Sequence, residues 1–396
     1  MRKIAKWNWL QVIRDWKTRI LLLFFLFFFA SFSLFYRQQN ITFPALEMDE
    51  EYEDERQIYR LIPPAHFESE VGKEVQAALG SNSVALGVNR YILSQQSGNE
   101  IKNMSSLPDY IENGRTLVEN NLFLHHAIDF ESHDLLVEMY LPPLEEVKEQ
   151  ERFYDALEES DLDVEWNPYS AVQMSKTEIE LLTGLTLFLL IAILAADHFT
   201  KDQANNWSVT QGWPVHWKVQ WRLRSGYLWV LFWFAFISGG IASYLLSLQL
   251  ETSGSFNYPT AIYQNDAIHY IPFWQYLIIT ISLTMLLSYL LLLVTTGLSW
   301  IFNNFYLTIL LVSSLFLIPQ IWSFLPAISS WQPSLYLNLS DVLTGVAAEQ
   351  TGFSNLVWWK AYIVYGIFLV LLEALFTKVF STIPTKTAGL QRREQK

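Results

Sequence analysis

The chain of 396 residues contains no cysteine. This absence excludes a disulfide framework, a thiol nucleophile and a thiolate-bound metal ion. The sequence also lacks the G-x-x-x-x-G-K-[ST] loop that cradles the phosphates of ATP in many ATPases. We therefore expect a protein that is not an enzyme, has no catalytic or metal-binding residues, and binds no cofactor within this chain.

Charged side chains are scarce and unevenly distributed. They make up 16% of the chain, whereas 51% of its residues are hydrophobic, a balance that is unusual for a soluble protein. Between Arg37 and Glu178 there are 29 acidic and 10 basic residues, and the remainder holds 10 acidic and 16 basic ones. An acidic, polar block is thus inserted into a basic, apolar chain.

Six apolar runs are long enough to cross a bilayer as α-helices, which takes about 20 residues each. They cover residues 20–36, 179–197, 227–248, 273–298, 306–325 and 358–377. The first run is not followed by a small-x-small cleavage site, so we interpret it as an uncleaved membrane helix. The sequence predicts an all-α polytopic membrane protein with six transmembrane helices.

Lysine and arginine indicate the orientation of these helices, because they collect on the cytoplasmic side. They are frequent in residues 1–19, 198–226 and 378–396 and absent from the connections 249–272 and 326–357. We therefore expect a multi-pass protein of the bacterial cytoplasmic membrane with both termini in the cytoplasm. Residues 198–226 are then a cytoplasmic loop and 378–396 a cytoplasmic tail, whereas the segment 326–357 and the acidic block lie outside.

The acidic block, residues 37–178, shows helical rather than alternating patterns. Hydrophobic residues recur at spacings near 3.6 at Phe67, Val71, Val75 and Ala78. At the end of the block, Ser175 and Glu178 have the spacing of a capping box that opens the second membrane helix. We predict a mostly helical extracytoplasmic domain inserted between membrane helices 1 and 2.

The same block carries acidic doublets such as Glu145-Glu146 and the pair His125-His126. Adjacent residues on a helix point about 100° apart, so such pairs do not converge on one ion. They indicate a solvated acidic face. A weak binding surface for a cation or a cationic peptide is the alternative.

Ionisable residues are nearly absent from the apolar runs. Glu373 is the one acidic residue well inside a run, near its cytoplasmic end and close to Lys378. A proton- or sodium-coupled carrier would carry more such groups or interrupted helices, and a membrane protease would need buried His and Glu ligands. The sequence disfavours both. Gly239-Gly240 predicts close helix packing in the third run, and Pro319 a kink in the fifth.

Two segments combine tryptophan with basic residues beside an apolar run. Residues 1–19 place tryptophans on one stripe, which predicts an amphipathic entry helix. Before residue 227, aromatic and basic residues each recur four apart, which suits a helix lying at the headgroup level. The predicted interfacial anchors are Trp9, Trp16, Trp217, Lys218, Trp221 and Arg222. Whether the two segments only anchor the chain or also contact a partner stays open.

Two stretches resemble the permease subunits of bacterial ABC-2 type ABC transporters. The first, ADHFTKDQANNWSVTQGWPVHWKVQWRLRSG, is similar to that family's acidic residue after the second span, followed by a threonine–proline region and a basic segment. The second, PSLYLNLSDVLTG, resembles the Pro-x-x-Tyr-x-Asn segment before the family's last span. Six spans, cytoplasmic termini and an amphipathic entry helix fit the same family.

The resemblance implies that the loop after the second span docks on a cytoplasmic ATPase subunit, which would bind ATP and magnesium. Carried over, this coupling role falls on Thr210, Gln211, Gly212, Trp213, Pro214, Val215 and His216. A second permease subunit, identical or different, and membrane lipid are the other implied partners, and nucleic acid is not one.

The function to expect is therefore that of the permease subunit of an ATP-driven exporter of an amphiphilic, peptide or lipid-like substrate. The alternative is a membrane sensor or scaffold whose acidic external domain binds a ligand.

Overall fold

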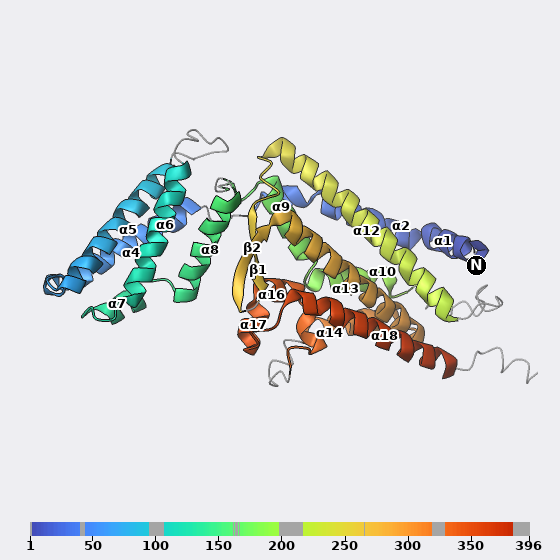
Figure 1. The fold of residues 1–396 in the computed structure, drawn as a ribbon. Helices are drawn as coiled ribbons and strands as arrows, with labels where there is room; N and C mark the ends of the chain where they lie inside the picture. The colour runs from blue at the N-terminus through green and yellow to red at the C-terminus, as the bar shows by residue number, and fades with distance from the viewer. Residues whose placement is uncertain are drawn as a thin grey trace, which may run out of the picture.

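The computed structural model describes residues 2–39, 44–94, 107–160, 162, 165, 167–197, 217–264, 266–318 and 329–382. In these residues the chain is mostly helical (Figure 1). A long bundle holds the apolar helices, and a group of polar helices lies beyond one end of that bundle.

The bundle combines helices from the N-terminal, middle and C-terminal parts of the chain. They are α1 (Arg2–Arg14), α2 (Trp16–Ala30), α3 (Phe32–Tyr36), α9 (Ala171–Leu181), α10 (Leu185–Ala195), α12 (Trp217–Leu250), α13 (Phe273–Phe302), α14 (Phe305–Leu315) and α18 (Trp358–Thr382).

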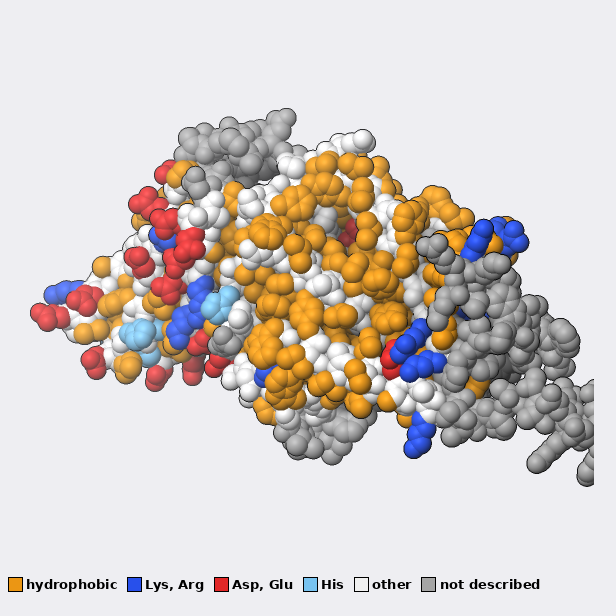
Figure 2. Space-filling model, turned by 45° about the vertical axis from the view of Figure 1, so that its right-hand side comes forward, with side chains coloured by type: hydrophobic (Ala, Val, Ile, Leu, Met, Phe, Trp, Pro, Cys, Tyr) orange, Lys and Arg blue, Asp and Glu red, His pale blue; other side chains and the backbone are white. Residues whose placement is uncertain are grey.

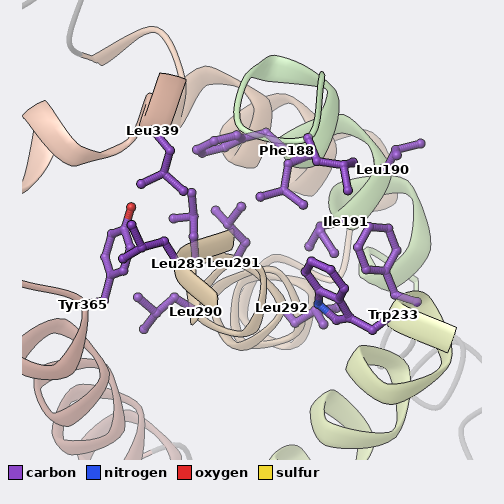
Figure 3. Close-up of a cluster of buried hydrophobic side chains, with 14 of the residues drawn as sticks. Phe188, Leu190, Ile191, Trp233, Leu283, Leu290, Leu291, Leu292, Leu339 and Tyr365 are labelled. Atoms are coloured by element: carbon purple, nitrogen blue, oxygen red, sulfur yellow. The ribbon is translucent and has the colours of Figure 1, made fainter. Parts of the chain in front are cut away.

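Helix α13 forms the centre of this bundle and packs against α9, α10, α12, α14 and α18. Its leucines meet Phe188 and Ile191 of α10, Trp233 of α12 and Tyr365 of α18 (Figure 3). Leu283 and Leu292 are completely buried there. The centre of the bundle is therefore filled with closely packed apolar side chains.

Three helices are long and apolar enough to cross a membrane. They contain Trp221–Leu250, Phe273–Phe302 and Trp358–Lys378. Helices α9 and α10 meet the same criterion only together, and they are bent by 61° at the break between them. The part of the chain that the structure describes thus contains three candidate membrane helices, or four with the bent pair, where six were expected.

The first and fifth expected spans differ most from the prediction. Residues 20–36 are divided between α2 and α3 at Ser31, whose hydroxyl donates to the carbonyl of Phe28 (3.1 Å). Such bonds from serine to the preceding turn bend helices. Helix α14 has only 11 residues, and the expected span 306–325 leaves the described residues at position 319, as does the kink expected at Pro319.

The polar helices form a second packed group. They are α4 (Pro44–Leu61), α5 (Glu70–Ser94), α6 (Leu107–His126), α7 (His133–Met139) and α8 (Leu144–Ser160), with a short 3-10 turn, η1 (Pro64–Phe67). Phe67, Val75 and Ala78 are buried in their shared core, as the 3.6-residue spacing predicted. This group therefore buries apolar surface of its own.

The connection 249–272 contains a β-hairpin, which corrects the expectation of an all-α protein. It contains the antiparallel strands β1 (Pro259–Gln264) and β2 (Ala267–Pro272), in which Gln264 is paired with Ala267 and Pro259 with Pro272. Asp266 has a left-handed conformation (φ 67°) at the tip, which aspartate tolerates better than most residues. Helix α8 packs against this hairpin.

The segment before α18 consists of short helical turns, η3 (Pro333–Tyr336), α16 (Leu339–Thr344) and α17 (Val346–Thr351). The backbone N–H of Leu339 donates to the carbonyl of Thr183 (3.3 Å), in the break between α9 and α10. This contact satisfies a carbonyl that the interrupted helix leaves free.

The capping box expected at Ser175 is wrong. Helix α9 begins earlier, and its N-cap is Ser170, whose hydroxyl accepts from the backbone N–H of Gln173 (3.3 Å). Ser175 lies inside the helix and donates to the carbonyl of Ala171 (2.8 Å). Glu178 therefore lies two turns inside α9 rather than at a helix start.

Candidate functional site

The basic end of the bundle brings together the segments that flank the predicted coupling loop. Lys17 at the start of α2 pairs with Asp197 after α10 (3.1 Å), and Arg222 near the start of α12 pairs with Glu373 of α18. Figure 2 shows lysine and arginine at this end, most acidic side chains at the opposite end, and hydrophobic side chains between them. Helix α10 thus ends and α12 begins at the same basic end.

The predicted coupling residues Thr210, Gln211, Gly212, Trp213, Pro214, Val215 and His216 lie outside the described residues. Their role stays a prediction. The chain is already helical at Trp217 and continues without interruption to Leu250. Residues 217–226 therefore belong to the long helix α12 and do not form a separate surface helix.

The two N-terminal anchors have different environments. Trp9 lies in α1 with its ring centre 5.2 Å from that of Tyr227 of α12. Trp16 begins α2 after the N-cap Asp15 and is 71% exposed. The expected entry helix over 1–19 is thus two helices, and only Trp16 presents a largely open aromatic surface.

The anchors at the start of α12 also differ. Trp221 is 1% exposed, its indole N–H donates to the carbonyl of Leu293 (3.1 Å), and its ring centre lies 5.2 Å from that of Phe376. Lys218 is half-buried and Arg222 exposed; of Trp217 only the backbone belongs to the described residues. Trp221 therefore joins α12 to α13 and α18, while the anchoring role of the others stays a prediction.

A groove of about 800 Å³ opens on the side of the bundle between α12, α13 and α18. Trp229, Met285 and Leu369 contribute to its mostly apolar wall, and Arg222 lies among its lining residues. The indole N–H of Trp229 donates to the carbonyl of Met285 (3.0 Å). An apolar wall with one charged group suits the chain of an amphiphile.

The broken helix α9–α10 carries two carboxyl groups inside the bundle. Glu178 is 2% exposed, and its Oε1 is buried without a hydrogen-bond partner. Glu180 instead accepts from the hydroxyl of Tyr276 of α13 (2.9 Å). A buried carboxylate without a partner is costly, and such groups usually serve a function.

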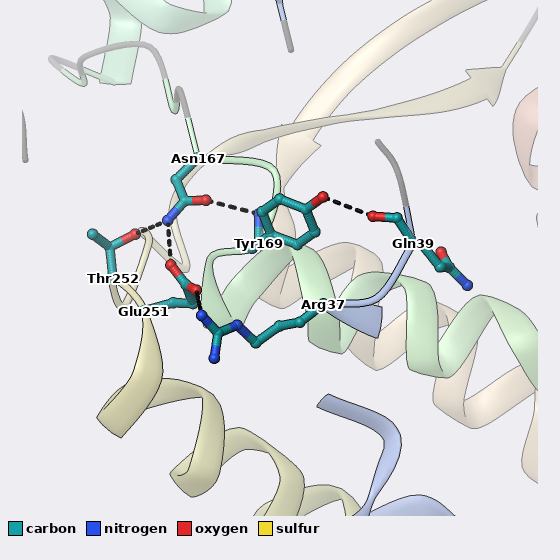
Figure 4. A network of polar contacts seen from close by, with 6 residues as sticks. All are labelled: Arg37, Gln39, Asn167, Tyr169, Glu251 and Thr252. Carbon is teal, nitrogen blue, oxygen red and sulfur yellow. Dashed lines mark hydrogen bonds and ion pairs between the residues drawn. The ribbon is translucent and has the colours of Figure 1, made fainter. Parts of the chain in front are cut away.

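At the end of the bundle opposite the basic end, a polar network joins the end of α3, the start of α9 and the end of α12 (Figure 4). We refer to this end as the outer end. Arg37, after α3, pairs with Glu251, after α12 (2.8 Å). Asn167, ahead of α9, donates to Glu251 (3.2 Å) and its side-chain oxygen accepts from the backbone N–H of Tyr169 (2.9 Å). We call Arg37, Asn167 and Glu251 the outer latch, because together they hold α3, α9 and α12 at one place.

A cleft of about 900 Å³ lies where α8 meets the hairpin and α16–α17. Five carboxyl groups line it, those of Glu145, Glu146, Glu149, Asp266 and Glu349. Among its described lining residues Arg152 is the one basic group, and this guanidinium donates to the carbonyl of Ile268 (3.1 Å). The cleft is therefore acidic, and the hairpin binds its basic side chain, that of Arg152.

The negative charge of the cleft also contributes to raised pKa values of two tyrosines that line it. The hydroxyl of Tyr270 donates to Glu149 (3.3 Å), and burial together with that carboxylate raises the pKa of Tyr270. Burial and Asp266 raise the pKa of Tyr263. In the described residues no group of three His, Cys, Asp or Glu side chains is placed to hold a metal ion. Carboxyl groups and aromatic rings that line the same cleft are features that attract an organic cation.

Sequence reasoning missed Glu178, Glu180 and the cleft. The two glutamates stand at the boundary between the acidic block and an apolar run, where side chains are ordinarily solvated. The hairpin, by contrast, had a readable signal: two residues, Asn265 and Asp266, separate two runs rich in β-branched and aromatic residues.

No family model matches this chain, and neither a curated protein nor a solved structure is similar enough to be a match.

Proposed function

We propose that this chain is the permease subunit of an ATP-driven exporter of the ABC-2 type, with six transmembrane helices, both termini in the cytoplasm and helices α4–α8 outside the membrane. A separate ATPase powers it. One observation carries the proposal: α10 ends and α12 begins at the basic end of the bundle, beside the start of α2 and the end of α18. Positive charge marks the cytoplasmic side of membrane proteins, where an ATPase is accessible.

The packing of the bundle bears on the path of the substrate. Apolar side chains fill the centre around α13 (Figure 3), so an amphiphilic, peptide or lipid-like substrate would pass along the side of the bundle. The lateral groove between α12, α13 and α18 offers such a place. A second permease subunit facing this groove would complete the path.

If the loop between α10 and α12 docks on an ATPase, binding of that ATPase should depend on the residues of the loop. A double variant, Gly212→Asp with Pro214→Asp, is expected to reduce recovery of a co-purifying ATPase by at least about tenfold, a loss of roughly 1.4 kcal/mol of binding free energy. The measurement is an affinity pull-down from gently solubilised membranes, with and without nucleotide, followed by mass spectrometry.

The matched control for this pull-down places the same charges elsewhere. Ser354→Asp with Asn355→Asp alters two exposed residues ahead of α18 and should leave ATPase recovery unchanged. Equal recovery with both double variants would remove the coupling role. If the unaltered chain brings down no ATPase at all, the transporter assignment fails.

The acidic cleft favours a second candidate function, a membrane sensor whose outer helices bind a cationic ligand. Its five carboxyl groups face the same space as Phe153, Tyr263 and Tyr270, which supplies both charge and aromatic surface for an organic cation. Helix α8 reaches the bundle through the hairpin, since Arg152 contacts Ile268. Ligand binding in the cleft would thus act on the connection between α12 and α13.

This sensor candidate predicts a measurable effect of one carboxyl group. Glu149→Gln is expected to weaken the binding of spermidine, used as a probe, about three- to tenfold, which corresponds to the loss of roughly 1 kcal/mol from one ionic contact. Calorimetry on the full chain at low salt measures it. Glu151→Gln is the control, because Glu151 is an exposed residue of α8 outside the cleft. An equal loss of affinity in both variants would mean that spermidine is attracted by diffuse surface charge and not bound in the cleft.

A further inference from the structure

Glu178 occupies a position where one oxygen of its carboxyl group is buried without a hydrogen-bond partner. The residue is 2% exposed and lies on α9, the first half of the bent helix pair. Its Oε1 has no hydrogen-bond partner. Because transfer of an unpaired charge from water into an apolar interior costs far more than transfer of the neutral acid, this position favours the neutral carboxyl group over the ionised one.

The carboxyl group of Glu178 packs against α12 at Gly240, a residue without a side chain. A Cβ atom at Gly240 would lie 3.5 Å from Oε1 of Glu178, an ordinary van der Waals distance. The carboxyl group of Glu178 therefore packs directly beside the backbone of α12 at Gly240.

Polar groups continue from this contact toward the outer latch. Ser243, about one turn from Gly240 on α12, donates to Sδ of Met174 (3.5 Å) and accepts from the backbone N–H of Ser33 (3.0 Å). The hydroxyl oxygen of Ser33 is buried and has no partner. Two unsatisfied oxygens, on Ser33 and Glu178, therefore belong to one contact between α3, α9 and α12.

Other ionisable groups lie on the elements packed around α9. Those nearest the outer latch are Tyr36 and Arg37 at the end of α3, Tyr244 of α12, Glu251 at the end of α12, Tyr276 of α13, and Lys176 and Glu180 of α9, whereas Lys218, Arg222, Arg224 and Tyr227 of α12 and Tyr289 of α13 lie toward the basic end. Glu165, ahead of α9, has both carboxyl oxygens buried without a hydrogen-bond partner, and the ring of Tyr244 packs on Phe256 with ring centres 5.8 Å apart. The hydroxyl of Tyr36 donates to the carbonyl of Pro168 (2.9 Å), Tyr276 donates to Glu180, and Arg37 pairs with Glu251. Residues two positions from Glu178 lie about 200° around the helix from it.

We propose that Glu178 is a proton-binding site, loaded from the outer side of the bundle, that holds α9 against α12 while it carries its proton. Loss of the proton leaves a charge that is stable only in water. The contact between Glu178 and Gly240 then opens. For α9 to move away from α12, the contacts of the outer latch must separate as well. This role applies to a transporter and to a sensor alike.

The direction of the pH effect follows from this arrangement. The packed state binds a proton that the opened state releases, so alkaline pH favours the opened state and acidic pH the packed one. Glu178→Gln keeps the shape of the acid and removes its charge. It is therefore expected to hold α9 against α12 at every pH.

The absence of cysteine makes a direct test possible. Ser33→Cys places one thiol beside the contact at a position that is 1% exposed, and the hydroxyl it replaces has no hydrogen-bond partner. The rate of maleimide labelling of the full chain is measured at pH 6 and pH 9, with and without Glu178→Gln. The same thiol in both backgrounds cancels the intrinsic pH dependence of thiol chemistry.

We expect the ratio of rates at pH 9 and pH 6 to be at least about tenfold larger with Glu178 than with the glutamine variant, because ionisation changes tenfold per pH unit. Glu180→Gln, whose carboxyl group has a tyrosine partner, is the matched control and should keep the large ratio. Equal ratios with and without Glu178→Gln overturn the proposal, and so does a loss of the ratio with Glu180→Gln.

Infrared difference spectroscopy gives a second and independent readout. The unaltered chain at neutral pH is expected to show the carbonyl stretch of protonated carboxylic acids. The Glu178→Gln variant is expected to lose the part of this band that comes from Glu178, whereas any part from Glu165, whose carboxyl oxygens are also buried without a partner, stays the same in both chains. An unchanged spectrum means that Glu178 is ionised in the packed state, which contradicts the proposal.

Discussion

Replacing Trp221 with alanine is expected to lower the free energy of unfolding by about 3–5 kcal/mol, the usual cost of removing a large buried aromatic residue. The side chain is 1% exposed and packs in a cluster with Leu293 and Phe376. Its loss also leaves the carbonyl of Leu293 without the indole donor. The cavity would open where α12, α13 and α18 meet, beside the pair of Arg222 and Glu373.

The measurement is thermal unfolding of the detergent-solubilised full chain, followed by tryptophan fluorescence and by aggregation. Trp16→Ala is the control, because this tryptophan is 71% exposed and its removal should change the free energy of unfolding by less than about 0.5 kcal/mol. Similar losses for both variants would contradict the buried position of Trp221 and favour a purely interfacial role.

The substitution Gly239→Leu should abolish stable packing of α2 on α12. A Cβ atom at this glycine would lie 2.7 Å from Cβ of Phe29 and 2.9 Å from the carbonyl oxygen of Leu26. Both atoms belong to α2, so the backbone of that helix would have to shift. Overpacking of this kind costs about 1–3 kcal/mol and occasionally more. Leucine adds three further carbon atoms, so we expect the upper end of this range or a loss of folded protein.

Gly366→Leu provides the matched comparison. This glycine lies in α18, inside another candidate membrane helix, and a Cβ atom there meets nothing within 4 Å. The yield of monodisperse protein and the midpoint of thermal unfolding should therefore stay close to those of the unaltered chain. If Gly239→Leu is equally well tolerated, α2 does not pack on α12 at this point.

The long apolar elements could be predicted because length and composition suffice to define them. Helices α12, α13 and α18 contain three of the expected runs and extend beyond them, and the glycine pair in the third run does sit at a close helix contact, as expected. At the break at Ser31 the serine hydroxyl bonds to the preceding turn, and at the break between α9 and α10 the carbonyl of Thr183 accepts from Leu339, which is distant along the chain. Contacts of this kind leave no periodic signal.

Burial of individual side chains was the least predictable feature. Trp16 and Trp221 look alike as aromatic residues next to basic ones, yet one is exposed and the other forms part of a core. Glu178 looks like the last residue of a solvated acidic block, and only its contact with α12 makes it a buried acid. In each case the deciding partner is distant in sequence.

The proposal that a cytoplasmic ATPase drives this chain through the loop between α10 and α12 can be tested by cross-linking in intact cells. A photo-reactive residue replaces Trp213, and in a separate variant Asp266 at the tip of the hairpin. We expect position 213 to form an adduct with a polypeptide that carries an ATP-binding motif, and position 266 to form none. No such adduct at position 213, or the same one from both positions, would contradict the proposal.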